Sequence, residues 1–473
     1  MMRFPVSLSI KIIAIYFCAL LIANLYFAQY ALSVHWVLFG ISATVFFFVS
    51  LNILAEKWGS LGNRAFICNL FLIALVFRIL YVLFIYHYYI DVTNSPLGYS
   101  DADAAGYDRI ARYLANNLKH GHWDLYHQIQ VYLKYMADLS DTGYVMYLSI
   151  VYAIFDDSML ASRLLKTVIS AYMCVFIYKL ARRNFGEQVG RLSGIIALLM
   201  PHFFYYCGVN LKETEMIFLS VVFLERSDHL LKSKKYSWTN VLVPVLCGAT
   251  LFFFRTVLAL TAFFSFFSAL IILSGKYLRW GKRLLLTCWM ALVLGYIAGG
   301  RILLEIDNYW NMQATNQQAA MQERAEYDGG NQFVKYASGM AFAPVILVIP
   351  FPTIVEVPKQ SIIKMRSGDY YVKNALAFFA MLGLYLIFKE KTWRRYALIG
   401  SFLVGYLIIV SSSAFVHSER FHLPALSCFI IFAAYGISRM RQRYIRWFNI
   451  YLIFLFFVMI GWAWFKLSGR GMV

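Results

Sequence analysis

Charged residues are scarce in this chain of 473 residues: Asp, Glu, Lys and Arg make up 14% of it, whereas 61% is hydrophobic. Soluble domains are about a quarter charged and about half apolar. The composition therefore excludes a soluble globule and indicates an all-α polytopic membrane protein. The chain is long enough for about a dozen spans of roughly 20 residues each, plus sizeable loops.

Acidic residues are the scarcer charge, with 24 Asp and Glu against 43 Lys and Arg and a net charge of +19. The basic residues stand in short loops between apolar runs, where they orient a membrane protein, so we expect no nucleic-acid partner. The seven cysteines contain no CxxC pair and mostly lie inside apolar runs. This pattern excludes a disulfide framework and a cysteine-based zinc site.

Thirteen apolar runs predict a bundle of about thirteen transmembrane helices in a single domain over residues 1–473. The runs cover residues 6–28, 34–55, 65–88, 157–180, 189–207, 213–230, 239–254, 256–274, 284–303, 372–388, 396–412, 422–438 and 446–465. The basic loops fall on one side if the N-terminus is cytoplasmic. The opposite, outer side then receives two long loops, 89–156 and 304–371.

Two further apolar segments do not fit regular spans. Residues 143–155 are too few to cross comfortably, so we expect a short outer-face helix there. Residues 338–355 contain three prolines, which argue against a regular helix and favour a re-entrant or interfacial element.

The first outer loop holds the sequence SDADAAGYDRIARYL at residues 100–114. Asp103 precedes a helix-like pattern to about residue 118, and it suits either an N-cap or a general base. Asp101 is the competing base, and Tyr107 is a candidate for substrate binding. Carboxylates at a membrane boundary are partly desolvated, which moves their pKa towards a value useful in proton transfer.

Two further outer-face elements are Lys212 with Glu213, where one apolar run ends and the next begins, and, separately, Arg255 between two short runs. Lys212 and Glu213 suit an ordinary polar turn in which an acid complements a helix N-terminus. Arg255 suits a contact with a lipid phosphate, or a side chain that snorkels to the headgroups.

A third group is HSERFHLP at residues 417–424. Metal binding by His417, Glu419 and His422 is conceivable, although their spacing matches no strong ligand motif. Arg420 suits an anion clamp, because a guanidinium grips phosphate with two parallel hydrogen bonds. The alternative is that Arg420 anchors the helix at the headgroups.

Four sequence blocks resemble one known family. DAAGYDRIARYL is similar to the first-loop acidic motif of polytopic GT-C glycosyltransferases, in their bacterial family 39-like, protein-mannosyltransferase-related branch. GYVMYLSIVYAIFDDSMLASRLLKTVISAYMCVFIYKLARRNFG, PHFFYYCGVNLKETEMIFL and RFHLPALSCFIIFAAYGI resemble later blocks, in family order over residues 65–225 and 410–440. The chain differs by lacking an Asp-Glu pair in its first loop and by two extra helices in residues 1–63.

The resemblance implies a GT-C-like bundle in the bacterial inner membrane that transfers a sugar from a polyprenyl-phosphate donor, with inversion, on the extracytoplasmic face. The acceptor would be a glycan, a lipid or a protein. Asp103 would be the base, with Asp101 as alternative. The implied substrate-binding residues are Arg420, Arg255, Lys212, Glu213, His417, Glu419, His422 and Tyr107. No cofactor is required, and a divalent cation is optional if arginine supplies the positive charge.

Two other classes share the many-span plan. A flippase or transporter of lipid-linked oligosaccharide favours charged residues in mid-span, and Arg78 is the clearest such residue. A polysaccharide polymerase or ligase also has many spans and a large outer loop.

Overall fold

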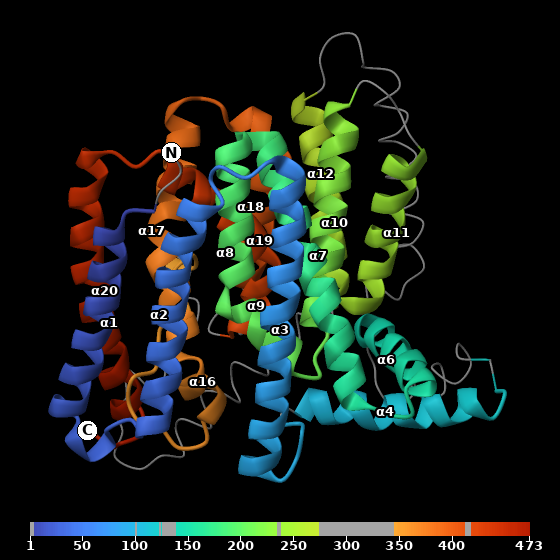
Figure 1. The fold of residues 1–473 in the computed structure, drawn as a ribbon, viewed down its shortest axis with the longest axis horizontal. Coiled ribbons are helices and arrows are strands. Elements are labelled where there is room, and N and C mark those ends of the chain that lie inside the picture. The colour runs from blue at the N-terminus through green and yellow to red at the C-terminus, as the bar shows by residue number, and fades with distance from the viewer. Residues whose placement is uncertain are drawn as a thin grey trace.

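The computed structural model describes residues 4–99, 102–122, 124, 139–233, 238–273, 345–411 and 418–473. Over these residues the chain is an all-α bundle without β-strands, and nine of its helical segments are long and apolar enough to cross a membrane. Most helices run roughly parallel, and two lie at one end of the bundle (Figure 1). The protein is therefore an all-α polytopic membrane protein, as its composition predicts.

The bundle consists of α1 (Val6–Tyr26), α2 (Val34–Lys57), α3 (Asn63–Thr93), α7 (Met159–Phe185), α8 (Glu187–Leu199), α9 (Pro201–Gly208), α10 (Glu213–Lys232), α11 (Trp238–Phe254), α12 (Thr256–Leu273), α17 (Ser367–Lys389), α18 (Ala397–Ser411), α19 (Glu419–Ser438) and α20 (Gln442–Ser468). Three helices and a 3₁₀ turn lie at one end of the bundle: α4 (Ala102–Lys119), η2 (Leu139–Asp141), α6 (Thr142–Ile154) and α16 (Ser361–Met365). Apart from 189–207 and 284–303, each predicted run corresponds to one helix. The run 284–303 lies outside the described residues, as do residues 304–344 of the second predicted outer loop.

The prediction of one span over 189–207 is wrong, because the helix breaks between α8 and α9. Pro201 has no N–H to continue the α8 ladder, and its ring disfavours helical backbone in the residue before it. Met200 accordingly has φ −61° and ψ 114°, an extended conformation. The carbonyl groups at the end of α8 therefore need partners other than the next helical turn.

Arg78 of α3 supplies those partners. Its guanidinium donates to the carbonyls of Ala197 (3.2 Å) and Leu198 (3.3 Å), and its Nε donates to Ser170 Oγ at 2.8 Å. The side chain is fully buried. Arg78 thus caps a helix end inside the membrane, which removes the main argument that it lines a transport path.

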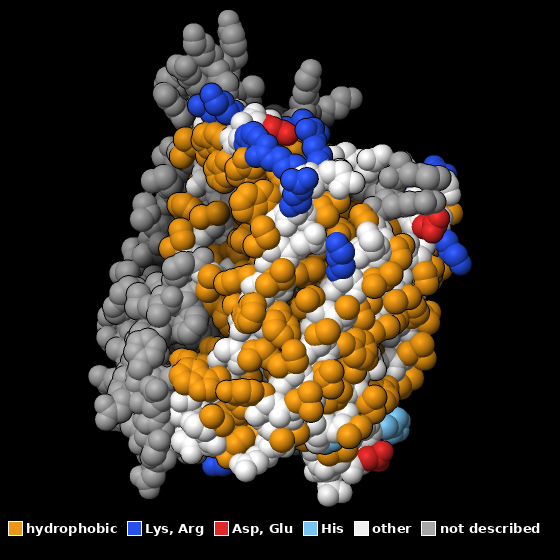
Figure 2. All heavy atoms as spheres, turned by 90° about the vertical axis from the view of Figure 1, so that its left-hand side faces the viewer, with side chains coloured by type: hydrophobic (Ala, Val, Ile, Leu, Met, Phe, Trp, Pro, Cys, Tyr) orange, Lys and Arg blue, Asp and Glu red, His pale blue; other side chains and the backbone are white. Residues whose placement is uncertain are grey.

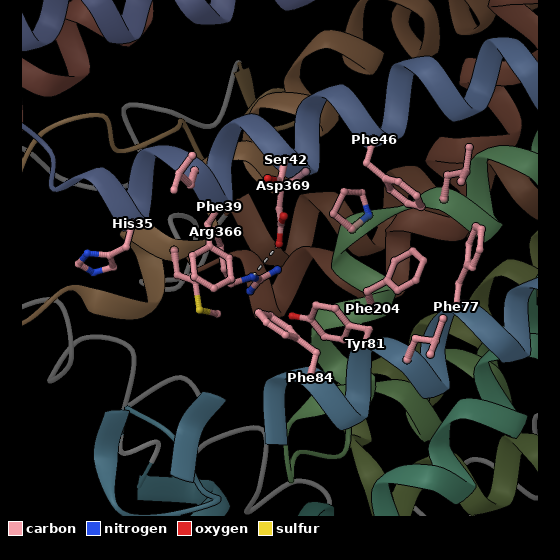
Figure 3. Close-up of a pocket in the computed structure, with 16 residues that line it drawn as sticks. His35, Phe39, Ser42, Phe46, Phe77, Tyr81, Phe84, Phe204, Arg366 and Asp369 are labelled. Atoms are coloured by element: carbon pink, nitrogen blue, oxygen red, sulfur yellow. Dashed lines mark hydrogen bonds and ion pairs between the residues drawn. The ribbon is translucent and has the colours of Figure 1, made fainter. Parts of the chain in front are cut away.

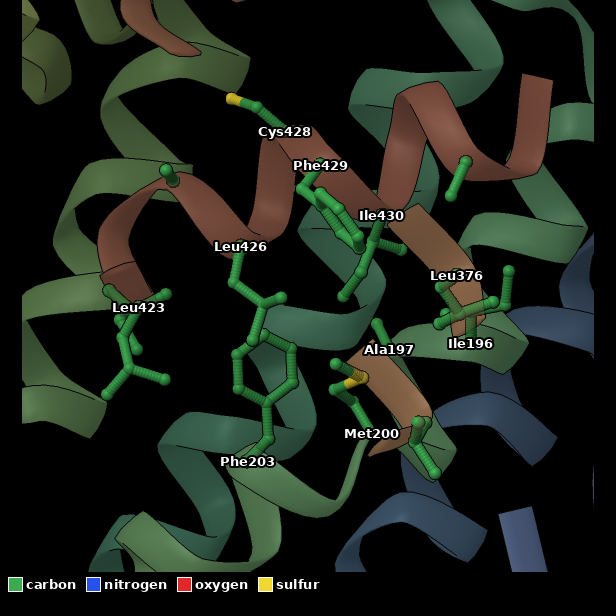
Figure 4. Close-up of a cluster of buried hydrophobic side chains, with 14 of the residues drawn as sticks. Ile196, Ala197, Met200, Phe203, Leu376, Leu423, Leu426, Cys428, Phe429 and Ile430 are labelled. Atoms are coloured by element: carbon green, nitrogen blue, oxygen red, sulfur yellow. The ribbon is translucent and has the colours of Figure 1, made fainter. Parts of the chain in front are cut away.

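The helices α17 and α19 pack with their backbones in close contact. Their shared core with α8 and α9 includes Ile196, Ala197, Met200, Phe203, Leu376, Leu423, Leu426, Phe429 and Ile430 (Figure 4). Gly436 faces the backbone of α17, where a Cβ would overlap the carbonyl oxygen of Phe379. Gly383 faces the backbone of α19 in the same way, at Phe432. Small residues let membrane helices approach this closely.

The lateral surface shows the expected membrane pattern. In the view of Figure 2, hydrophobic side chains cover the middle of the face, and most Lys and Arg side chains gather at its upper end. That end carries the exposed Arg441 and Arg443 before and at the start of α20. The helices α4 and α6 lie at the opposite end (Figure 1). The bundle is thus polarised, with one basic end and one end covered by short helices.

Neither of the two segments predicted not to span, residues 143–155 and 338–355, forms a long helix in its described residues. α6 is a short helix packed against α4. Residues 345–360 form no regular helix, and residues 338–344 lie outside the described part of the chain. Asn374 donates to the carbonyl of Pro350 (3.1 Å) and Lys373 to that of Ile349. Irregular backbone at membrane depth needs such internal partners, since lipid offers none.

We expect Gly436→Ala to destabilise the fold by about 1–3 kcal/mol, because the added methyl group forces α17 and α19 apart. Gly461→Ala is the matched control: Gly461 lies within α20 with nothing near its Cβ position, so alanine there is neutral or stabilising. Thermal unfolding of both variants in the same detergent measures the difference. Equal melting temperatures would contradict the close α17–α19 contact.

Candidate functional site

A cluster of charged side chains lies at the end of the bundle that carries α4 and α6, where five segments meet. These are α4, η2, the start of α10, the junction of α11 with α12, and the start of α19. We call it the outer charge cluster; it comprises Asp103, Tyr107, Asp141, Lys212, Glu213, Arg255 and Arg420. Several of the candidates predicted from the sequence therefore do come together in space.

Arg420 is the centre of the outer charge cluster. It lies in the first turn of α19 and forms ion pairs with Asp103 of α4 and Glu213 of α10. The Glu213 side chain is 0% exposed, whereas that of Asp103 is 54% exposed. One guanidinium thus joins a buried carboxylate to a second carboxylate that faces solvent.

Asp103 is not the N-cap of its helix, in contrast to one of the two sequence interpretations. α4 begins at Ala102, so Asp103 lies in the first helical turn. Ile110, Ala111 and Leu114 are buried on the inner face of α4, as their spacing predicts. Asp101, the competing candidate, lies outside the described residues.

Lys212 is the second cation of the outer charge cluster, and it contacts two other segments, η2 and the end of α11. Its Nζ donates to the carbonyls of Phe254 (2.7 Å) and Ser140 (3.1 Å) and forms an ion pair with Asp141. Tyr107 donates its hydroxyl hydrogen to Asp141 Oδ1 at 2.9 Å. Burial raises the pKa of Asp141, but the charge and hydrogen bond of Lys212 outweigh it, so the pKa lies below its usual value.

Arg255 is the third cation and differs from the other two. It joins α11 to α12, its Nη1 lies 3.5 Å from the Tyr406 hydroxyl, and its guanidinium lies 4.5 Å from the centre of the Phe421 ring. Among the residues that the structure describes, no carboxylate lies within 4.0 Å of it. Within the described part of the chain, Arg255 thus forms no direct ion pair, and it interacts with Glu213 only at longer range.

A second layer behind the outer charge cluster escaped the sequence analysis. Lys166 of α7 is fully buried, and its Nζ lies 3.7 Å from Glu215 Oε2 and 4.8 Å from the centre of the Tyr144 ring. Lys166 stands inside the predicted span 157–180, and a lysine in mid-span was the available signal. Asp141 also escaped notice, although it directly precedes the short helix α6.

Glu419 and His422 do not join the outer charge cluster. Glu419 forms an ion pair with Arg366, and its Oε1 lies 3.2 Å from His202 Nε2. His422 Nδ1 lies 3.4 Å from Lys373 Nζ. Arg366 also donates to Asp369 Oδ2 at 3.2 Å, and its guanidinium lies 3.9 Å from the centre of the Tyr205 ring. Arg366 and Asp369 were missed because both stand in the second predicted outer loop, away from any recognised motif.

The proposed metal set of His417, Glu419 and His422 is not assembled by the described residues. His417 lies outside them, and Glu419 and His422 each face a cation, Arg366 and Lys373 respectively. Over the described ranges, no three His, Cys, Asp or Glu side chains converge in a way that could hold a metal ion.

Residues 144–298 match the family model of dolichyl-phosphate-mannose-protein mannosyltransferases. This match confirms the GT-C resemblance seen in the sequence blocks. It covers α6 to α12, and so includes Lys212, Glu213 and Arg255. No curated protein and no solved structure matches the chain.

The two carboxylates on Arg420 should differ in their effect on stability. Glu213→Gln removes charge from a fully buried ion pair and should destabilise the fold by about 3 kcal/mol. Asp103→Asn alters a half-exposed pair and should lower stability by less than about 1 kcal/mol. Thermal unfolding in detergent compares the two variants. A larger loss for Asp103→Asn would show that Glu213 is not the structural partner of Arg420.

Proposed function

We propose that this membrane glycosyltransferase of the GT-C type transfers a sugar from a polyprenyl-phosphate-linked donor to an acceptor hydroxyl, with inversion at the anomeric carbon. The observation that carries the proposal is the half-exposed carboxylate of Asp103, held against Arg420 in a cluster that also contains Arg255. A carboxylate reachable from solvent and two cations beside it are what a phosphate-releasing displacement needs.

Asp103 acts as the general base in this proposal. The acceptor oxygen attacks the anomeric carbon while its proton passes to the Asp103 carboxylate. The bond from the anomeric carbon to the phosphate oxygen breaks, and its electron pair leaves with the polyprenyl phosphate. A single displacement of this kind inverts the configuration. Arg420 fixes the position of the carboxylate, as an ion pair with two partners restrains both of them.

Arg255 stabilises the leaving phosphate. Negative charge grows on the phosphate oxygen as the bond breaks, and a nearby cation lowers the energy of that transition state. Arg255 suits this role better than Lys212, whose charge is already matched by Asp141. Arg420 is likewise engaged by two carboxylates, so it contributes position more than free charge.

The outer face of the membrane is the proposed side of the reaction. The outer charge cluster lies at the end of the bundle opposite the basic end of Figure 2. Since Lys and Arg mark the cytoplasmic side, the cluster would face away from the cytoplasm, in the inner membrane of a bacterium. The acceptor is a glycan, lipid or protein hydroxyl that reaches this face.

The test is sugar transfer by the purified protein from a polyprenyl-phosphate donor. The polyprenyl phosphate released in the reaction measures the transfer. Asp103→Asn should lower kcat by roughly 10²–10⁴-fold, because the amide cannot accept the proton. Asp108→Asn is the matched control on the same helix. The Asp108 carboxylate accepts hydrogen bonds from Arg112 Nε (2.9 Å) and from the Tyr152 hydroxyl (2.7 Å), and it takes no part in the outer charge cluster.

Asp101→Asn separates the two candidate bases, because only the true base should show the full loss of kcat. Unchanged kcat in both Asp103→Asn and Asp101→Asn would rule out a first-loop aspartate as the base. Absence of transfer by the wild-type protein with every polyprenyl-phosphate donor tested would count against the donor class itself.

A further inference from the structure

A groove of about 670 Å³ lies between α2 and α3, with α9 and the start of α17 at its floor (Figure 3). Its volume falls in the range of about 300–1,000 Å³ that is typical of ligand pockets. Apolar side chains make up most of its walls: Leu38, Phe39, Phe46, Phe77, Leu80 and Phe84. The lining therefore suits a hydrophobic ligand.

The groove exists because α2 and α3 share only α8 among their main packing partners. α2 lies against α1, α8 and α17, whereas α3 lies against α7, α8 and α9. Large rings bridge the space between the two helices, with 5.6 Å between the centres of Phe46 and Phe77 and 6.3 Å between those of Phe39 and Phe84. Between α2 and α3, the groove is thus bounded by side chains and not by backbone. These side chains can change rotamer.

The mouth of the groove faces the lateral surface of the bundle. Leu38 is 58% exposed, Leu80 59% and Phe84 54%, although all three are apolar. In a membrane-spanning bundle such residues face lipid chains rather than water. A ligand would therefore enter the groove sideways, from the bilayer.

The inner end of the groove is polar but carries no unmatched positive charge. Arg366 points into it, and Asp369 lies beside it at 3.2 Å (Figure 3). The same guanidinium donates to Glu419 Oε1 at 2.7 Å. Two carboxylates thus surround one arginine, so the inner end has little attraction for a phosphate. The groove suits the uncharged chain of a lipid rather than its headgroup.

The first turn of α19 links the groove to the outer charge cluster. Glu419 pairs with Arg366, which lines the inner end of the groove, and the next residue, Arg420, pairs with Asp103 of the cluster. Consecutive residues of a helix point about 100° apart, so one helical turn can serve both contacts. The groove and the cluster therefore share the first turn of α19 as a common support.

We infer that this groove binds the isoprenoid chain of the lipid-linked sugar donor, an inference that rests on the proposed function. The phosphate and sugar then lie towards Arg255 and Asp103, where free positive charge and the base are found. α2 and α3, which form the walls of the groove, precede residues 144–298, so the family match covers only the lining from Leu199, Pro201 and Phe204. Of the two N-terminal helices that distinguish this chain, α2 thereby gains a role in donor binding.

Photo-crosslinking of the wild-type protein tests the site directly. The probe is a long-chain polyprenyl phosphate with a diazirine in its isoprenoid chain, added to the full-length protein in detergent. We expect the label on α2 and α3, displaced by unlabelled polyprenyl phosphate but not by excess phosphatidylglycerol. Label on other helices, or displacement by phosphatidylglycerol, would overturn the inference while leaving the proposed function in place. No labelling at all would count against the donor class as well.

Ala43→Trp fills the groove from α2 and should raise the Kd of long-chain polyprenyl phosphate by about tenfold, since buried apolar contacts are lost. The Kd of a short-chain isoprenyl phosphate should stay unchanged, because its chain gains little from the groove. Ser50→Trp is the matched control: it adds the same ring two turns further along the same face of α2, outside the lining. An equal effect of Ala43→Trp on both chain lengths, or an equal effect of Ser50→Trp, would contradict the assignment.

Discussion

The first turn of α19 is the constraint on which the rest of the structure depends. Glu419 and Arg420 are neighbours in the chain, yet each forms its own ion pairs, and only the Asp103 carboxylate among their partners is half-exposed. Glu419 holds Arg366 before α17, and Arg420 holds Glu213 of α10 and Asp103 of α4. Buried charges are tolerated only when they are paired and hydrogen-bonded. These two residues therefore join the start of α19 to three other segments of the chain, at the end of the bundle that carries α4.

The helices themselves could be predicted from the sequence, because in a membrane every backbone group must be satisfied within its own segment. An apolar run of sufficient length therefore specifies a helix almost alone, as α1, α2 and α20 illustrate. The break at Pro201 was not predicted. It depends on Arg78 reaching the end of α8 from α3, which compensates for the hydrogen bonds that proline removes. Such compensation between distant segments leaves no trace in a hydropathy pattern.

The sequence could predict which charged residues belong to the candidate site, but not which of them form ion pairs with one another. Charged residues at the ends of predicted spans indicated Asp103, Lys212, Glu213, Arg255 and Arg420. Which of them meet depends on contacts across the chain, since Arg420 and Asp103 are separated by 317 residues. The sequence also grouped Glu419 and His422 with Arg420, because they are close neighbours. Helical geometry sends these side chains to different faces, so proximity in sequence misled the grouping.

Charged side chains in this protein fall into two kinds, according to how fully close partners engage them. Those that are fully engaged hold the structure together, and those that are less engaged are the candidates for function. Arg366, Arg420 and Lys212 each have carboxylate partners, and Arg78 has backbone carbonyls; such groups hold segments together and have little free charge to offer a ligand. Arg255 has no carboxylate within 4.0 Å in the described part of the chain, and Asp103 keeps half of its side chain exposed. Arg255 and Asp103 both belong to the outer charge cluster, at the end of the bundle opposite the basic loops. A groove whose arginine is paired with carboxylates, and a cluster in which Arg255 forms no direct ion pair with a described residue, form the arrangement expected if an apolar chain and an anionic head are to be held by different parts of the same bundle.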